Sequence, residues 1–132
     1  MAIEVGLVNE TTLTVQESDT ARHTGGETLQ PVLGTPRLIQ RIEHTAHMGV
    51  YPLLAPGQTM VGTSIYVKHL AATPIGMQVR FRAELVEVDG RRLRFKVEAW
   101  DEVEKIAEGE HERFIIDEAR FAERIAKKAR RG

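Results

Sequence analysis

Residues 62–76 have the sequence GTSIYVKHLAATPIG, which is the most informative part of the chain. The first part is typical of a β-strand that carries His69 near its end, and a small-residue loop closed by Pro74 and Gly76 follows it. An imidazole can gain or lose a proton near neutral pH. His69 is therefore suited to proton transfer at a fixed point, although a histidine at a strand end often only hydrogen-bonds to a backbone carbonyl.

Period-two patterns continue on the C-terminal side of this stretch. They predict strands over about 60–70, 77–88, 91–101 and 105–116, with Asp89-Gly90 as a hairpin turn. The second and third of these strands each have one apolar face, made by Val79, Phe81, Ala83, Leu85, Leu93, Phe95, Val97 and Ala99. Residues 117–132 are predicted to form a C-terminal helix whose apolar stripe consists of Phe121, Ile125 and Ala129.

On the N-terminal side, Thr35-Pro36 predicts the start of a helix, with Thr35 as N-cap and Pro36 at the first helical position. The helix extends to about residue 50, and one face consists of Leu38, Ile42, Thr45, Ala46 and Gly49. Gly49 also indicates close packing against a neighbouring sheet. Residues 3–15 are predicted as a first strand, with a face drawn from Val5, Leu7, Thr11, Leu13 and Val15. Residues 17–34 contain three glycines and a proline and are predicted as a long loop or lid.

The resulting order is strand, loop, helix, four antiparallel strands and terminal helix. One helix before a run of antiparallel strands predicts an α+β fold in which the sheet wraps around the helix. The same order is compatible with a cone-shaped sheet of the cystatin or nuclear-transport-factor type, so it leaves the fold family open. With 132 residues, the chain is expected to form one domain over 1–132.

Composition narrows the function classes. The chain has no cysteine, which excludes disulfides and thiolate chemistry and fits a reducing compartment. A formal net charge of −1 argues against nucleic acid as a partner, because phosphate binding normally needs an excess of basic residues. The N-terminus lacks the pattern of a signal peptide, and no segment is long and apolar enough to span a membrane. We therefore expect a cytoplasmic protein that binds neither nucleic acid nor membrane.

Three further side chains could take part in chemistry. Glu43 lies at the edge of the helix's apolar face, where either a solvated glutamate or a general base and its orienter is expected. Thr35 is explained by capping, but its hydroxyl would also lie beside unpaired backbone N–H groups that suit a developing oxyanion. Arg113, on the last strand, is either an ion-paired surface residue or a ligand for a phosphate or carboxylate.

A metal site is not expected. His44 and His47 are three residues apart on the predicted helix and could share an ion, but the sequence supplies no third histidine or cysteine at a recognisable spacing.

Taken together, Thr35, Glu43, Gly62, His69 and Arg113 have the spacing of the fluoroacetyl-coenzyme A thioesterases, which have the hot-dog fold. Three short sequence segments support the resemblance: AATPIG at 71–76, VDGRRL at 88–93 and GEHER at 109–113. The resemblance covers about residues 35–121. It implies that Thr35, Glu43 and His69 form the catalytic group, with Thr35 as nucleophile or anchor of a water. Gly62 and Arg113 match the family's strand glycine and late arginine, and the resemblance implies that these two residues bind the substrate.

The resemblance further implies an acyl-CoA thioesterase that acts on a small or short-chain acyl group. No cofactor is expected beyond the CoA of the substrate, and the expected assembly is a homodimer or a dimer of dimers. The family's lid carries phenylalanines that select the fluorinated acyl group, whereas residues 25–34 contain no aromatic residue, so fluoroacetyl selectivity is not expected. Two alternatives on the same fold are an enoyl-thioester hydratase and a non-catalytic acyl-CoA-binding module.

Overall fold

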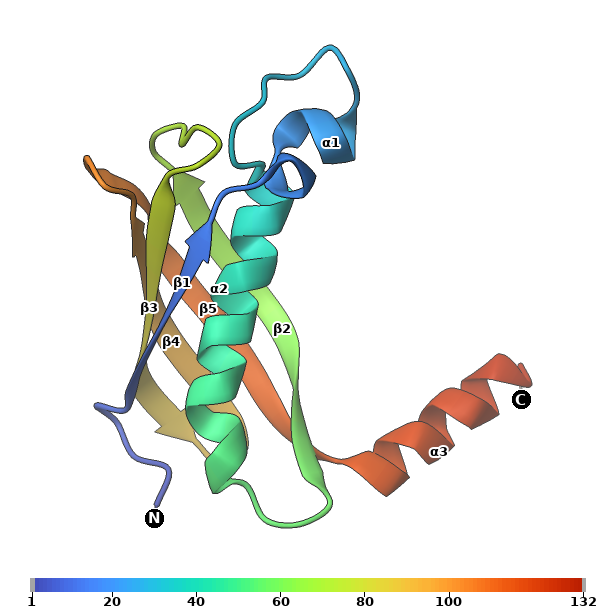
Figure 1. Cartoon of the computed structure of the whole chain (residues 1–132). Coiled ribbons are helices and arrows are strands. Elements are labelled where there is room, and N and C mark those ends of the chain that lie inside the picture. The colour runs from blue at the N-terminus through green and yellow to red at the C-terminus, as the bar shows by residue number, and fades with distance from the viewer. Residues whose placement is uncertain (1, 132) are drawn as a thin grey trace.

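The structure is a computed structural model that describes residues 2–131. One antiparallel sheet wraps around a long central helix, α2, as expected from the element order (Figure 1). The strands are β1 (Val8–Thr14), β2 (Gln58–His69), β3 (Gln78–Asp89), β4 (Arg92–Trp100) and β5 (Lys105–Asp117). They lie side by side in the order β1-β3-β4-β5-β2. The helices are α1 (Ala21–Gly25), α2 (Thr35–Val50) and α3 (Glu118–Ala129), with 3-10 turns at Glu17–Asp19 and Tyr51–Leu53.

The core lies between α2 and the concave face of the sheet. All eight residues predicted for the apolar faces of β3 and β4 are buried, and from α2 they meet Leu38, Ile42, Ala46 and Val50. The Asp89-Gly90 hairpin is confirmed, since Asp89 pairs with Arg92 and Gly90 adopts a φ of 61°. Gly49 approaches β1 closely enough that a Cβ would lie 2.9 Å from that of Asn9, which explains the glycine.

A bulge in β2 decides which side chains face α2. The ladder between β2 and β5 shifts register between Gly62 and Ser64. Cross-strand partners share a face of a sheet, and Gly62 pairs with Arg113 while His69 pairs with Ala107. In a regular strand, residues seven apart would lie on opposite faces, but the extra residue at the bulge brings Gly62 and His69 to the α2 side.

Three details differ from the sequence-based predictions. β1 begins at Val8 and not at residue 3, because the chain turns at Gly6, which has a φ of 102°; Val5 is consequently exposed. Residues 17–34 are not a plain loop, since they contain a 3-10 turn and α1. The N-cap of α2 is Gly34, because its backbone is extended and its carbonyl oxygen accepts from the Leu38 N–H, so Thr35 is the first helical residue. The Thr35 hydroxyl bonds to another side chain.

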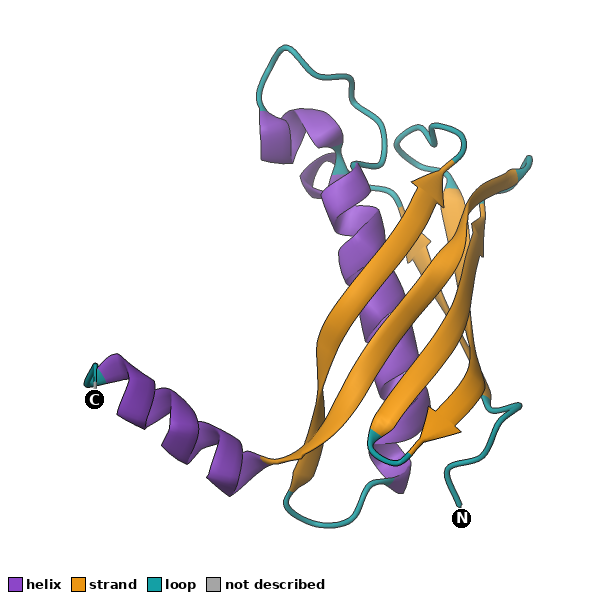
Figure 2. Ribbon diagram, turned by 180° about the vertical axis from the view of Figure 1, so that it is seen from behind, coloured by secondary structure: helices purple, strands orange, loops and turns teal. Residues whose placement is uncertain are grey.

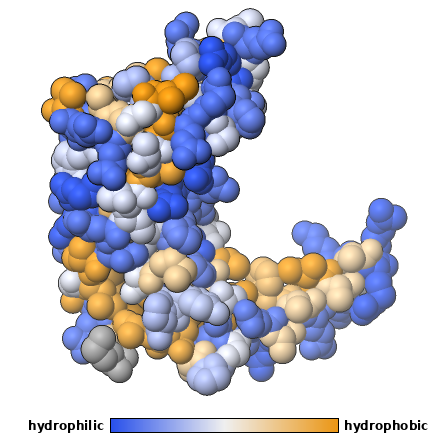
Figure 3. All heavy atoms as spheres, in the orientation of Figure 1, coloured by the Kyte–Doolittle hydropathy of each residue, from blue (hydrophilic) through white to orange (hydrophobic). Residues whose placement is uncertain are grey.

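The C-terminal helix α3 projects away from the sheet (Figures 1 and 2). It begins one residue later than predicted, at Glu118, with Asp117 as N-cap. None of its residues is buried, and Ile125 is 53% exposed. Figure 3 shows apolar side chains along its length, so the predicted apolar stripe exists but does not cover this chain's own core. Within residues 2–131, no helix has both the length and the hydropathy needed to cross a membrane.

Candidate active site

A direct hydrogen bond joins Thr35 and His69. Thr35 Oγ1 lies 2.8 Å from His69 Nδ1, where the first turn of α2 meets the end of β2. Thr35 is exposed and His69 is partly buried, so solvent or a ligand can reach the hydroxyl. Either atom can be the donor in this bond, depending on the tautomer of the ring.

The second nitrogen of His69, Nε2, is buried and has no hydrogen-bond partner within residues 2–131. Burial lowers the pKa of His69 below its usual value, and the neighbouring backbone of Ala71 partly offsets that effect. A neutral imidazole with one nitrogen on a hydroxyl and the other unpaired is the state that a general base needs near neutral pH.

A second group forms around Arg113, farther along the same helix and strand. The Arg113 Nη1 atom lies 3.7 Å from Glu43 Oε1, and the Arg113 side chain is only 9% exposed. Gly62 leaves space here, because a Cβ at this position would lie 2.8 Å from Glu43 Oε1 and 3.4 Å from Arg113 Nη1. The glycine therefore leaves the room in which the carboxylate and the guanidinium meet.

Two histidines that sequence reasoning did not place in the site complete this group. His111 Nε2 lies 3.1 Å from Arg113 Nη1, and His47 Nδ1 lies 3.1 Å from Arg113 Nη2. His111 is 1% exposed, and its Nδ1 bonds to the carbonyl oxygen of Ser64 at 2.8 Å. We call Glu43, His47, Gly62, His111 and Arg113 the Arg113 cluster. The alternation of β5, which puts His111 and Arg113 on one face, was the available sequence signal for His111.

The structure thus divides the five predicted residues into two sets. Thr35 and His69 meet at one end of α2, and Glu43, Gly62 and Arg113 meet eight residues farther along it. Eight residues of α-helix span roughly 12 Å, so within one chain Glu43 does not complete a hydrogen-bonded triad with Thr35 and His69.

The predicted lid is anchored beside Thr35. Asp19 is 5% exposed and accepts a hydrogen bond of 2.8 Å from Arg37 Nε on α2. Leu33 is buried and pairs with Thr20 as an isolated bridge. An open hollow lies between this segment and α2, with Asp19, His23, Pro36, Gln40 and Glu43 among its lining residues. The lid segment therefore borders the same side of α2 as the candidate residues.

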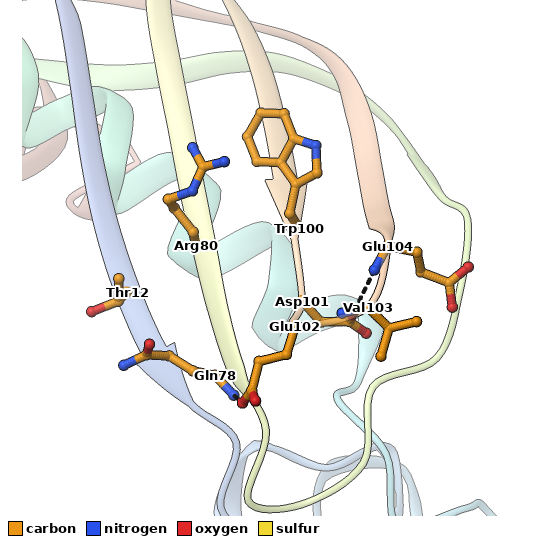
Figure 4. Close-up of a pocket in the computed structure, with 8 residues that line it drawn as sticks. All are labelled: Thr12, Gln78, Arg80, Trp100, Asp101, Glu102, Val103 and Glu104. Atoms are coloured by element: carbon orange, nitrogen blue, oxygen red, sulfur yellow. Dashed lines mark hydrogen bonds between the residues drawn. The ribbon is translucent and has the colours of Figure 1, made fainter.

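Another hollow lies on the outer face of the sheet, where its polar groups bond to one another (Figure 4). Arg80 lies over the ring of Trp100, 4.3 Å from the ring centroid, and pairs with Glu10 at 2.9 Å. The backbone N–H of Gln78 donates to Glu102 Oε2 at 2.7 Å. None of the five predicted site residues lines this hollow, which we consider part of the surface.

Comparisons with known proteins identify the family of the chain. The model of the family described as fluoroacetyl-CoA-specific thioesterase matches residues 15–119. The fluoroacetyl-CoA thioesterase of Streptantibioticus cattleyicolor is 39% identical over 101 residues, which cover 76% of this chain and 73% of that protein.

Solved structures extend the likeness over nearly the whole chain. A structure of the fluoroacetyl-CoA thioesterase FlK superimposes with a TM-score of 0.92 at 33% identity, covering 97% of this chain and 98% of that one. A thioesterase superfamily member from Thermus thermophilus gives a TM-score of 0.91 at 26% identity over 98% and 96% of the two chains. The family match and the identity to a relative show that this chain belongs to the fluoroacetyl-CoA-specific thioesterase family and is a hot-dog-fold thioester hydrolase.

Proposed function

We propose that this enzyme hydrolyses acyl-CoA thioesters of small acyl groups to the free acid and CoA, with His69 as the proton-transfer residue. The observation that carries the assignment is the 2.8 Å contact between Thr35 Oγ1 and His69 Nδ1, with His69 Nε2 left unpaired within residues 2–131. A hydroxyl beside a neutral imidazole is the arrangement that activates an attacking oxygen.

In this mechanism, the attacking oxygen is the Thr35 hydroxyl or a water anchored by it. His69 accepts the proton of that oxygen as it bonds to the thioester carbon, and later returns the proton to the departing CoA sulfur. The first backbone N–H groups of α2 lie beside Thr35 and favour the negative charge that develops on the carbonyl oxygen. The family match supports a small acyl group, and the aromatic-free segment 25–34 supports the absence of a preference for fluorine.

The open edge of β2 supports a homodimer. Within residues 2–131, β2 pairs only with β5, and its other edge carries Ile65 and Tyr66, which are 36% and 66% exposed. A long edge strand with apolar side chains is a ready template for pairing with a second chain. We propose that two copies join their sheets through antiparallel pairing of their β2 strands; two such dimers could associate further.

The register of that pairing follows from the two separated sets of residues. In antiparallel pairing about a two-fold axis, paired residues share a face of the sheet, so the residue on the axis must face its own copy. With the exposed Tyr66 on the axis, residue 64 pairs with residue 68, and the extra residue at the bulge sets Gly62 opposite His69. His69 of one protomer would then lie beside Gly62 of its partner. Because the bulge keeps both residues on the α2 side, each site would combine Thr35 and His69 with the partner's Glu43 and Arg113.

Glu43 would then serve as base or orienter across the interface, with Arg113 and Gly62 at the substrate. We expect no cofactor beyond the CoA of the substrate, because imidazole, hydroxyl and carboxylate supply attack and proton transfer. The cysteine-free composition and the net charge of −1 support a cytoplasmic enzyme without a nucleic-acid or membrane partner.

Thiol release from a panel of acyl-CoA thioesters, from two-carbon to long-chain, tests the activity. Fastest turnover of the shortest substrates, lost in His69→Ala, is the expected result. Hydration of enoyl-CoA without thiol release, or ligand-dependent thermal stabilisation without turnover, would contradict it.

Mixing two inactive variants tests the shared site. In a heterodimer of His69→Ala and Glu43→Gln protomers, one site carries both changes and the other carries neither. Refolding the two variants together at equal amounts should therefore restore about a quarter of wild-type activity, because half of the dimers would hold one intact site of two. No recovery from chains that do form mixed dimers would place each site within one chain.

A further inference from the structure

The Arg113 side chain has unusual partners for a buried guanidinium. Two imidazoles accept its hydrogen bonds at 3.1 Å each, the carbonyl oxygen of Met60 lies 3.4 Å away, and the nearest carboxylate, that of Glu43, is 3.7 Å away and 40% exposed. A buried cation is normally held by a carboxylate at hydrogen-bond distance. In the Arg113 cluster, neutral acceptors from α2 and β5 orient the cation without cancelling its charge.

The hydrogen bonds fix opposite tautomers of the two rings. The carbonyl oxygen of Ser64 can only accept, so His111 must carry its proton on Nδ1 and use Nε2 to accept from Arg113. His47 accepts from Arg113 through Nδ1, so its proton belongs on Nε2. The His47 ring also stacks on Tyr51, with 5.1 Å between the ring centroids, which holds it in this orientation.

From this geometry we infer that His47 and His111 are positioning residues for the thioesterase reaction. Their hydrogen bonds orient the positively charged guanidinium of Arg113 toward Glu43 and toward the substrate bound there. This inference rests on the proposed function, because it assigns Arg113 to the active site. Neither histidine needs to touch the substrate. Each acts by accepting one hydrogen bond from Arg113 at the edge of the space that Gly62 keeps open.

The surroundings keep both rings able to accept. Burial lowers the pKa of His111; the hydrogen bond to the Ser64 carbonyl acts against it, Arg113 acts in the same direction, and Glu43 and Glu112 raise the pKa slightly. Burial also lowers the pKa of His47, and the charges of Arg113 and His44 add to that effect. Both rings are therefore neutral near pH 7, and protonation of either would remove an acceptor and bring a second positive charge to Arg113.

Amide substitutions can separate the two nitrogens of each ring. The terminal atoms of asparagine lie near the position of Nδ1, and those of glutamine near that of Nε2. His111→Gln therefore keeps an acceptor for Arg113, whereas His111→Asn keeps only the bond to Ser64. At His47 the order reverses, because there Nδ1 is the acceptor.

The decisive experiment measures kcat, KM and thermal unfolding for these four variants on a short-chain acyl-CoA. We expect kcat of His111→Gln to exceed that of His111→Asn by about tenfold, and kcat of His47→Asn to exceed that of His47→Gln similarly, as for a lost hydrogen bond to a charged group. In an Arg113→Lys background, both differences should shrink. His44, exposed on the same helix, provides the control, since His44→Asn and His44→Gln should have equal kcat.

The outcome at His111 separates positioning from stability. A bond to a charged group is worth more than one to a neutral carbonyl oxygen, so His111→Asn should be no more stable than His111→Gln, and kcat is therefore compared well below the unfolding temperature of both variants. If the two amides have equal kcat at each site, or if the differences persist in the Arg113→Lys background, the inference is wrong while the thioesterase assignment stands. Loss of the assignment itself would appear as absence of thiol release by the wild-type enzyme.

A measurement on the wild-type enzyme avoids variants that do not fold. The ¹⁵N chemical shifts of the imidazole nitrogens report the tautomer directly, and at pH 7.5 we expect the Nδ1–H form for His111 and the Nε2–H form for His47. The same tautomer at both positions, or a protonated ring at either, would overturn the inference.

Discussion

The Thr35–His69 pair and the Arg113 cluster lie along the same helix and strand but differ in how fully their polar atoms are bonded. Thr35 is exposed, and His69 has a single side-chain hydrogen bond and one nitrogen without a partner within residues 2–131. In the Arg113 cluster, both ring nitrogens of His111 and both terminal nitrogens of Arg113 have partners, and Arg113 Nε is the buried atom that lacks one within residues 2–131. The first arrangement leaves bonds for a substrate, and the second fixes a charge in space.

From this difference we infer two roles: the Thr35–His69 pair transfers protons, and the Arg113 cluster provides a fixed electrostatic field. Proton transfer needs groups that can exchange partners during the reaction, whereas electrostatic stabilisation needs groups that do not reorient. If the division is correct, changes at the pair should abolish turnover without loss of stability. Changes in the Arg113 cluster should affect both quantities.

The largest effect is expected for His69→Ala. Removal of the proton-transfer group should lower kcat by about 10²- to 10⁴-fold, while the melting temperature changes little because the ring is only partly buried. Thiol release and thermal unfolding measure the two quantities, and Lys68→Ala, an exposed neighbour on the same strand, is the matched control. Near wild-type kcat in His69→Ala would remove His69 from the mechanism.

A charge at the edge of β2 should have the next largest effect. Tyr66→Glu places like charges face to face in the proposed dimer, so the protein should become monomeric and lose at least about tenfold in activity, because each site would lack the partner's residues. Sedimentation velocity and thiol release on the same samples check this. Val103→Glu, which changes an exposed apolar residue elsewhere, is the control. A fully active monomeric Tyr66→Glu would place the complete site within one chain.

Gly62→Ala tests the Arg113 cluster with a single methyl group. The new Cβ would lie 2.8 Å from Glu43 Oε1, so the carboxylate must move away from Arg113. Because that oxygen is the far end of a flexible side chain that is 40% exposed, we expect at most about 1 kcal/mol of destabilisation, together with a lower kcat. Adding Glu43→Ala should remove this small destabilisation but not restore activity, since it removes the clash and the carboxylate together. Unchanged kcat in Gly62→Ala would show that the position of Glu43 is unimportant.

The smallest effect concerns pH. Burial lowers the pKa of His47, His69 and His111 in the folded protein relative to the unfolded chain. As pH falls, the unfolded chain therefore takes up protons at these histidines before the folded protein does. Their contribution to the free energy of unfolding is fully present above the unfolded pKa of about 6.5. That contribution is lost as pH falls through the lower folded pKa values. Urea unfolding between pH 7.5 and 5 should show falling stability with a shallower slope in His111→Asn; a flat profile would contradict the shifts.

Much of the fold could be predicted from the sequence because its signals are local. The alternation of β3 and β4, the Asp89-Gly90 hairpin and the Pro36 helix start each depend on residues close together in the chain. The element order was compatible with more than one fold family, and the resemblance carried by residues such as His69 and Gly62 identified the hot-dog fold. The start of β1 was misplaced because the turn at Gly6 interrupts an otherwise suitable pattern.

The sequence by itself determined which residue types were available, their faces on each element, and the family to which they belong. Only the tertiary structure decided which of them meet. In the structure, Thr35 and His69 lie apart from Glu43, which is beside Arg113. The Thr35 hydroxyl bonds to the His69 ring and does not cap the helix. His47 and His111 both form hydrogen bonds with Arg113. The physical reason is that the Thr35–His69 and His47–Arg113 contacts join residues 34 and 66 positions apart, and that the face of Gly62 and His69 depends on one bulge in β2. The His111–Arg113 contact joins residues two apart on β5, and there the local alternation was the available signal. Local periodicity fixes a face of an element, but not what that face will touch.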